Sequence, residues 1–352
     1  MLIRIERSQP STVARGEGRV SEQLRRPSLV RSLWGWVRSL VLRRPLLAVF
    51  QVNLRCNSSC GYCNLPLNAG RYEMSREEIK TVFARLYRDG LRLVFLQGGE
   101  PVLRKDLIGI LEDLHEVGFR ITVITNGTKL TVPLVKQFDN LGISLSISLD
   151  TLNPATYERI RGADQLAPVL AGVDLLRHYR HPKFLTCIVS EANREDVPEV
   201  VAFARQRGFL PVVGAYHWDV GLYGKQDTTL MYDRRQARLV FEQLLQQDRL
   251  PPGYCRQYAM DNVTWLAGGA LSPCDAGSYS IAIDASGNVS PCLSLPPAGN
   301  LRESSLSEIL SRFDRRRIQS CSDHSSCNRV DGRVIGSVLR HPIAAWQTPV
   351  SW

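Results

Sequence analysis

The chain has 352 residues and 44% apolar content, so it can bury a large core and form one catalytic domain with an appendage. The first ten residues carry Arg4, Glu6 and Arg7 instead of an apolar signal segment. Nine cysteines without an export signal favour metal ligation in a reducing cytoplasm over a disulfide framework. The sequence holds no P-loop and no glycine-rich dinucleotide motif, which argues against nucleotide-triphosphate and nicotinamide chemistry.

Residues 1–46 are predicted to be a basic extension, because ten arginines against three glutamates precede Leu46 and supply most of the net charge of +10. Residues 29–40 can form an amphipathic helix with two tryptophans on or near its apolar face. That helix is too short to span a bilayer but suits the inner face of an anionic membrane. The alternative is a helix packed on the outside of the fold with solvated arginines. No nucleic-acid-binding module accompanies the charge, so we expect no nucleic acid partner.

Residues 47–230 alternate between apolar strand patterns and amphipathic helix patterns. Ser75, followed by two acidic residues, is typical of a helix N-cap, and Gly90 is typical of a C-cap. Six strand–helix units predict an α/β fold, a partial (β/α)6 TIM-type barrel. Such an incomplete barrel would leave a lateral opening for a large substrate. The expected strands are residues 48–54, 92–97, 120–124, 144–149, 183–189 and 210–215.

Cys56, Cys60 and Cys63 lie on one short loop after the first strand. Three thiolates leave a four-iron cluster one ligand short, so a small molecule can bind the open iron and receive an electron. The same spacing suits a structural zinc site that takes its fourth ligand from elsewhere in the fold. The cysteine loop alone therefore leaves both metals open.

Polar side chains collect where the next strands end. The second strand is followed by Gly98-Gly99-Glu100-Pro101, whose glycines let a ligand approach the main chain. The third ends in Thr125-Asn126, and the fourth holds Ser148 and ends in Asp150. Because loops at the carboxyl ends of parallel strands converge on one pocket, these residues predict a ligand site there.

In this order, the cysteine loop, the Gly-Gly-Glu-Pro segment and the polar strand ends resemble the radical S-adenosylmethionine (radical SAM) superfamily over residues 50–209. The resemblance implies that Cys56, Cys60 and Cys63 hold a 4Fe-4S cluster whose open iron binds SAM. An electron from a donor such as flavodoxin or ferredoxin would then cleave SAM to a 5′-deoxyadenosyl radical, which removes hydrogen from a substrate. A zinc module would need none of the later motifs.

The resemblance also implies which residues contact SAM. Gly98, Gly99 and Glu100, with Pro101, match the segment that receives the methionyl ammonium group, and Tyr62 matches a position near adenine. The alternative for each polar residue is an ordinary cap, turn or solvated side chain. The remaining expected contacts are Thr125, Asn126, Ser148 and Asp150, for ribose or the methionyl group, and Arg161, for the cofactor carboxylate.

Residues 231–335 hold five of the nine cysteines, and residues 336–352 are predicted to be a tail. The stretch between Cys274 and Cys292 has the pattern of a β-hairpin that turns at residues 284–288. It resembles the opening of a SPASM or twitch domain, a small cysteine-rich α+β module. The likeness implies one auxiliary 4Fe-4S cluster, and a zinc ribbon is the alternative. The implied ligands are Cys274, Cys292, Cys321 and Cys327, with His324 as an alternate and Cys255 as a replacement ligand, a substrate-holding thiol or a packing residue.

These resemblances predict an oxidoreductase or maturase-type enzyme that abstracts hydrogen from a peptide or a biosynthetic small molecule. The auxiliary cluster would accept an electron or bind substrate. If the amphipathic helix contacts a membrane, a lipid or lipid precursor becomes the alternative substrate. A non-catalytic iron–sulfur electron carrier or scaffold also stays open, because no side chain selects the substrate.

Overall fold

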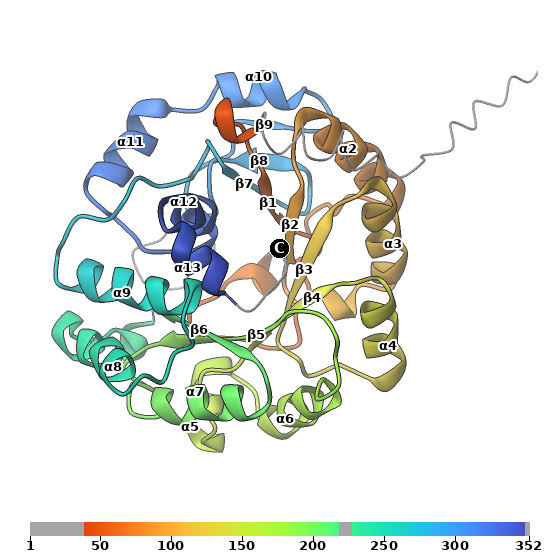
Figure 1. Ribbon diagram of the computed structural model, residues 1–352. Helices are drawn as coiled ribbons and strands as arrows, with labels where there is room; N and C mark the ends of the chain where they lie inside the picture. The colour runs from red at the N-terminus through yellow and green to blue at the C-terminus, as the bar shows by residue number, and fades with distance from the viewer. Residues whose placement is uncertain (1–38, 218–226, 349–352) are drawn as a thin grey trace, which may run out of the picture.

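A computed structural model describes residues 39–217 and 227–348 of the protein. Within these residues one nine-stranded sheet forms the centre of the molecule, in the order β6-β5-β4-β3-β2-β1-β7-β8-β9 (Figure 1). Strands β1 to β6 pair in parallel with their chain neighbours. The strands are β1 (Leu47–Gln51), β2 (Leu93–Gln97), β3 (Arg120–Thr125), β4 (Ser144–Ser148), β5 (Lys183–Val189), β6 (Leu210–Ala215), β7 (Ser280–Ile283), β8 (Asn288–Ser290) and β9 (Gly299–Asn300).

Helices follow the parallel strands and ring the outside of the sheet (Figure 1). Helix α2 has clear capping signals at both ends, since Ser75 and Glu78 form a capping box and Gly90 ends the helix. This arrangement confirms the partial (β/α)6 barrel. The barrel helices are α2 (Arg76–Asp89), α3 (Leu107–Val117), α4 (Val132–Asn140), α5 (Pro154–Arg161), α6 (Leu166–Leu175) and α7 (Val197–Gln206).

The α-helices that follow β6 in the described chain are α8 (Arg234–Gln246), α9 (Tyr254–Leu266), α10 (Leu306–Ser311), α11 (Arg315–Asp323), α12 (Val334–Arg340) and α13 (Pro342–Gln347). The short 3-10 helices of the described chain are η1 (Leu65–Asn68), η2 (Pro101–Leu103), η3 (Thr228–Leu230) and η4 (Val330–Gly332).

The core lies between the sheet and the barrel helices, because these helices bury their apolar residues against the sheet. In α2, Ile79, Val82, Phe83 and Leu86 are almost fully buried, and the Phe83 ring lies 4.9 Å from that of Phe50 on β1. Burying such side chains contributes roughly 1.5–3 kcal/mol each. The barrel helices are therefore fixed on a rigid sheet, which holds the loops at the strand ends.

The expected hairpin in the C-terminal third is present, since β7 and β8 pair antiparallel. Its position was not expected, because β7 also pairs in parallel with β1, with Leu47 opposite Ser280. Strand β1 would otherwise be a sheet edge with unpaired backbone groups. The boundaries at residues 230 and 335 stay predictions, but the sheet runs without a break from the barrel into the C-terminal third.

The lateral opening expected for a large substrate stays a prediction, and within the described chain the C-terminal third covers part of that side of the barrel. Helix α9 packs against β6, and Tyr254, Tyr258 and Val334 form one apolar cluster with residues of the barrel. Leu47, Val49 and Val212 belong to the same cluster, and packing against the C-terminal third removes their apolar side chains from water.

Most of the amphipathic helix expected at residues 29–40 lies outside the described residues. Among the helices that the structure does describe, none combines the length and the apolar character needed to cross a bilayer.

Candidate active site

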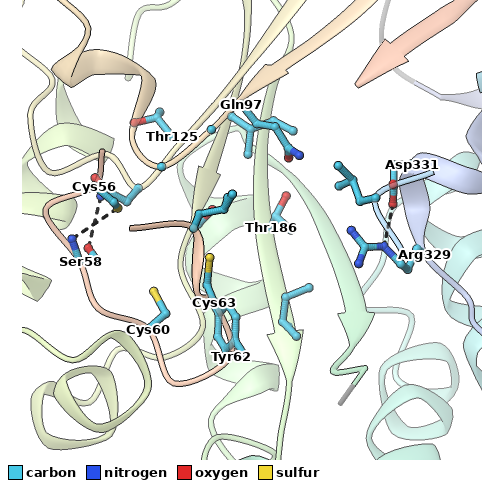
Figure 2. A pocket seen from close by; sticks show the side chains of 18 of the residues that line it. Cys56, Ser58, Cys60, Tyr62, Cys63, Gln97, Thr125, Thr186, Arg329 and Asp331 are labelled. Atoms are coloured by element: carbon cyan, nitrogen blue, oxygen red, sulfur yellow. Dashed lines mark hydrogen bonds and ion pairs between the residues drawn. The ribbon is translucent and has the colours of Figure 1, made fainter. Parts of the chain in front are cut away.

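The loops at the carboxyl ends of the parallel strands surround a cavity of about 360 Å³ (Figure 2). Most of the barrel residues singled out in the sequence line this cavity, while Glu100, Pro101 and Asp150 lie outside its lining. Sequence order and strand position were thus enough to predict that these side chains lie close together. The lining residues that we expected are Cys56, Cys60, Tyr62, Cys63, Gly98, Gly99, Thr125, Asn126, Ser148 and Arg161.

The cysteine loop is tied to the end of α5 and to the loop after β3 through backbone and amide contacts. The N–H groups of Ser59 and Gly61 donate to the carbonyls of Arg161 and Ile160 at 3.0 and 3.1 Å. Asn126 donates its side-chain amide to Asn57 at 2.9 Å. The three thiols are therefore presented on a fixed loop.

Two thiols of this loop lie beside hydrogen-bond donors. The N–H of Ser58 donates to Cys56 Sγ at 3.4 Å, and a terminal nitrogen of Arg161 lies 4.0 Å from Cys60 Sγ. Burial raises the pKa of the Cys56 thiol to about 11, although the Ser58 N–H opposes this effect. Without metal the Cys56 thiol stays protonated, and a bound iron displaces that proton.

Glu100 holds the loop after β3. Its buried carboxylate accepts hydrogen bonds from Thr125 Oγ1 at 2.6 Å and from the N–H of Asn126 at 2.7 Å. A third bond comes from the N–H of Val102, just after Pro101 at the start of η2. Burial raises the pKa of Glu100, and these donors oppose the rise. Glu100 is thus a positioning residue here, and its expected contact with an ammonium group stays a prediction.

Asp150 has a similar place behind the opposite wall. It is fully buried, pairs with Arg161 at 2.6 Å and accepts the Tyr62 hydroxyl at 3.3 Å. The N–H of Ile188 on β5 donates to its other oxygen at 2.8 Å. Asp150 therefore orients Tyr62 and Arg161, both of which line the cavity, and its own direct contact with a ligand stays a prediction.

Gly98 and Gly99 fit against the chain just before the cysteine loop. A Cβ on Gly99 would overlap the carbonyl of Arg55, and the N–H of Gly99 donates to Asn53 O at 3.0 Å. We expected these glycines to admit a ligand. In the structure, the missing side chains let the main chain at Asn53 and Arg55 approach closely.

The expected auxiliary ligands gather in the C-terminal third. Cys327 lies close enough to interact electrostatically with both Cys274 and Cys292. The N–H of Cys274 donates to Ser322, the residue after Cys321, at 3.0 Å. Cys292 accepts the N–H of Ser294 at 3.4 Å, which repeats the contact between Ser58 and Cys56. These contacts fit an auxiliary cluster, whose ligand set stays a prediction.

Two other expected candidates stand apart from this set. Cys255 is buried in the apolar cluster between α9 and the sheet, where it packs with Leu47 and Val334. The His324 ring bonds to the carbonyl of Ser320 on its own helix at 2.8 Å. The packing role thus fits Cys255 best.

The family model of the radical SAM superfamily matches residues 51–204, and that of an iron–sulfur cluster-binding domain, SPASM, matches residues 274–343. The chain belongs to the radical SAM superfamily. The resemblances found in the sequence are thereby confirmed, including the C-terminal SPASM domain. A 4Fe-4S cluster, SAM and auxiliary-cluster chemistry follow from these two domains.

Two curated relatives of this radical SAM protein show how far the similarity extends. A probable GTP 3′,8-cyclase of Methanothermobacter marburgensis is 35% identical over 176 residues, which are 47% of this chain and 56% of the relative. The chain thus spans about half the length of that relative. An AdoMet-dependent heme synthase of Methanosarcina barkeri is 26% identical over 75% of this chain and 82% of its own.

Solved structures with the same fold include Streptococcus suis SuiB bound to its precursor peptide SuiA, with a TM-score of 0.62 and 17% identity. That match covers 89% of this chain and 75% of SuiB. Native anSMEcpe with bound AdoMet also reaches a TM-score of 0.62 at 17% identity, covering 79% of this chain and 84% of its own. These similarities show the fold alone.

The residues of this radical SAM protein fit a cluster and SAM. Arg161 Nε and Gln51 Oε1 are buried in the cavity wall without a hydrogen-bond partner among the described residues. Such atoms indicate a polar ligand. The described chain holds no group of three or more His, Cys, Asp or Glu placed to bind a single metal ion.

Sequence reasoning missed several residues that line the cavity of this radical SAM protein. Gln51 and Gln97 end β1 and β2 as register partners, so the rule that found Asn126 applied to them too. No local signal marked the residues that reach the cavity from the C-terminal third. They are Tyr258, Leu293, Arg329, Val330 and Asp331.

Proposed function

We propose that this protein abstracts a hydrogen atom from a peptide or a biosynthetic small molecule, with SAM as its oxidant. One observation carries the proposal. The cysteine loop of the barrel and residues of the C-terminal third, Tyr258 on α9 with Leu293 and Arg329 of the SPASM domain, line the same cavity. A substrate bound against the C-terminal wall would face the cofactor directly, as the chemistry requires.

The cluster held by Cys56, Cys60 and Cys63 would supply the electron that cleaves SAM to methionine and a 5′-deoxyadenosyl radical. Arg161, held by Asp150, would bind the cofactor carboxylate, and Tyr62 would pack near adenine. Leu65, Ile124 and Ile188 line the cavity with apolar surface that excludes water from the reacting atoms.

Cys274, Cys292, Cys321 and Cys327 would hold one auxiliary 4Fe-4S cluster that accepts an electron from the substrate or anchors it. Radical SAM enzymes take electrons from an external donor, and a flavodoxin or ferredoxin is proposed here. A non-catalytic carrier, the other class left open by the sequence, would not need a cavity that joins the two domains.

The test is anaerobic incubation of reconstituted protein with dithionite and SAM, followed by measurement of 5′-deoxyadenosine. We expect product from the parent protein and about eight irons per chain, four for each cluster. A Cys56→Ala/Cys60→Ala/Cys63→Ala variant should keep about four irons and form no product.

The matched control is Cys187→Ala, because Cys187 is a buried thiol of β5 that does not line the cavity. It should keep both the iron content and the product. No product from a parent protein that holds its full iron complement would contradict the proposed function and favour an electron carrier.

A further inference from the structure

The cavity wall opposite the cysteine loop carries an ion pair from the SPASM domain (Figure 2). Arg329 Nε lies 3.1 Å from Asp331 Oδ1. Arg329 precedes η4, and Asp331 lies within it. Both side chains line the same cavity as the thiols of the barrel, so the pair faces the space where a substrate must bind.

The segment that carries this pair is held from several sides. Tyr258 on α9 donates its hydroxyl to Asn328 O at 2.8 Å, and Arg333 donates to Cys327 O at 3.1 and 3.2 Å. The N–H of Asp275 donates to Gly332 O at 2.7 Å. The main chain on both sides of the pair is therefore fixed before a ligand arrives, which reduces the entropy cost of binding.

Part of the hydrogen-bonding capacity of the pair is unused. Within the described chain, Arg329 donates through Nε alone, and Asp331 accepts through Oδ1 alone. The Arg329 side chain remains 30% exposed and that of Asp331 12% exposed, although both are cavity-lining residues. Arg161, the other arginine of the cavity, is 7% exposed and already paired with Asp150. Arg329 is thus the more exposed of the two arginines that line the cavity.

We propose that Arg329 and Asp331 recognise the substrate, and that the substrate carries a carboxylate or phosphate with an N–H or O–H donor beside it. A guanidinium binds such anions through a planar pair of donors. The free oxygen of Asp331 accepts a hydrogen bond from an N–H or O–H group that lies beside the anion of the ligand. An anion without such a donor is repelled by the Asp331 carboxylate. This inference rests on the proposed function, since it assigns the substrate side of the same cavity.

The neighbours of the pair fit the rest of such a substrate. Leu293, Val330 and the ring of Tyr258 line the cavity next to it. These apolar surfaces can pack against the carbon frame of a ligand whose polar end is held by the pair. A low-dielectric surrounding also strengthens the charge interaction.

The test measures binding of four small probes to the SAM-loaded holoprotein by ligand-observed NMR. Glycolate has a carboxylate beside a hydroxyl, glycerol 1-phosphate has a phosphate near hydroxyls, acetate lacks a donor, and glycerol lacks charge. We expect glycolate or glycerol phosphate to bind better than acetate and glycerol. Which of the two binds better distinguishes a carboxylate substrate from a phosphate substrate.

Arg329→Gln should weaken binding of the preferred probe about tenfold or more, because a charged hydrogen-bond partner is lost. Arg329→Lys should restore part of it, since the charge remains without the planar pair of donors. Asp331→Asn should remove the preference for glycolate over acetate. Arg316→Gln removes the same charge from an exposed arginine of α11 and should change nothing.

Iron content confirms that each variant is folded, and the lysine and Asp331→Asn variants keep the test valid if Arg329→Gln does not fold. The inference is overturned if no probe binds selectively, or if Arg329→Gln binds like the parent. In that case the pair is structural. Formation of 5′-deoxyadenosine by the same parent preparation is measured in parallel. Selective binding without that product would overturn the proposed function and leave only the anion-binding role of the pair.

Discussion

Two buried carboxylates act on the cavity from behind its walls. Glu100 holds the Thr125–Asn126 turn, and Asp150 holds Arg161 and Tyr62. Each buried charge is compensated by several donors, which such a charge requires. These two residues therefore shape the cavity beside the cysteine loop without lining it.

Replacing Asp150 by Asn should destabilise the fold by about 3–5 kcal/mol, because buried Arg161 then loses its 2.6 Å partner. SAM affinity should fall about tenfold, since Arg161 and Tyr62 lose their orientation. Denaturant unfolding and calorimetric titration with SAM measure the two effects. Asp174→Asn is the control, because the pair of Asp174 with Arg207 is half exposed and contributes less than about 1 kcal/mol. Equal losses in both variants would contradict the positioning role of Asp150.

At the residue scale, the sequence predicted the side chains that follow apolar strands, because chain position alone places them at the strand ends. It could not separate Ser148, which lines the cavity, from Asp150, which lies behind Arg161. That difference depends on side-chain direction and on the partner residue. Arg329 and Asp331 were missed because only tertiary packing brings them to the barrel.

At the element scale, the loop after β1 is the feature that the sequence placed least accurately. The apolar pattern predicted a strand to residue 54, but β1 ends at Gln51. The following main chain turns against the loop after β2, where Gly99 N donates to Asn53 O and Glu100 N donates to Arg55 O. The cysteine loop begins directly after this contact, so its position depends on a close approach of two backbones.

Gly99→Ala should displace the cysteine loop, because an added Cβ would overlap the carbonyl of Arg55. We expect a loss of about 1–3 kcal/mol in stability and lower iron occupancy after reconstitution. Iron analysis and thermal unfolding measure these effects. Gly70→Ala is the matched control, since nothing in the described structure lies within 4 Å of a Cβ at that site. Normal iron binding by Gly99→Ala would show that the contact is not needed.

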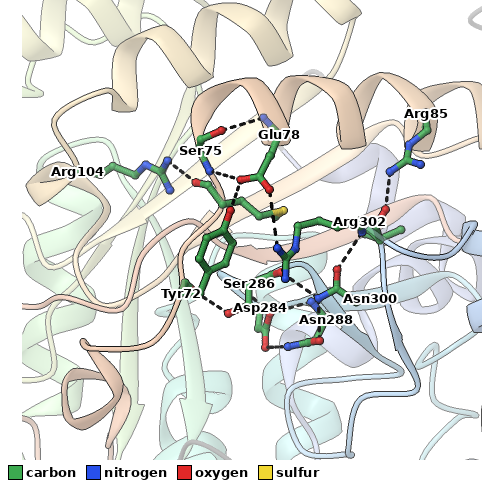
Figure 3. Close-up of polar contacts among 12 residues, drawn as sticks. Tyr72, Ser75, Glu78, Arg85, Arg104, Asp284, Ser286, Asn288, Asn300 and Arg302 are labelled. Atoms are coloured by element: carbon green, nitrogen blue, oxygen red, sulfur yellow. Dashed lines mark hydrogen bonds and ion pairs between the residues drawn. The ribbon is translucent and has the colours of Figure 1, made fainter.

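At the scale of the whole molecule, the barrel and the C-terminal third are joined by both sheet pairing and polar contacts. Figure 3 shows the contacts between the α2 region and the loops of β7 to β9, with Ser286 donating to Tyr72 O and Arg302 lying 3.9 Å from Glu78. Asn300 also bonds to Asn288 at 2.9 Å within the C-terminal part. The sequence predicted two modules in chain order, and only the three-dimensional pairing of β1 with β7 shows their continuity.

This continuity predicts that the two parts unfold together. If β1 and β7 share one cooperative unit, their amides should exchange with deuterium at the same free energy of opening in the anaerobic holoprotein. The pairing register gives the comparison, since Val49 lies opposite Ala282 and Phe50 opposite Ile283. Helix α4 serves as an internal reference on the far side of β3.

The C-terminal third opens alone if the amides of β7 to β9 exchange at a much lower free energy of opening than those of β1, while β1 and α4 stay protected. The cavity would then be assembled from two separable parts, and SAM should protect β1 without protecting β7. Joint protection of both strands by SAM is the outcome that a shared sheet requires, because closing the cavity stabilises each wall through the other.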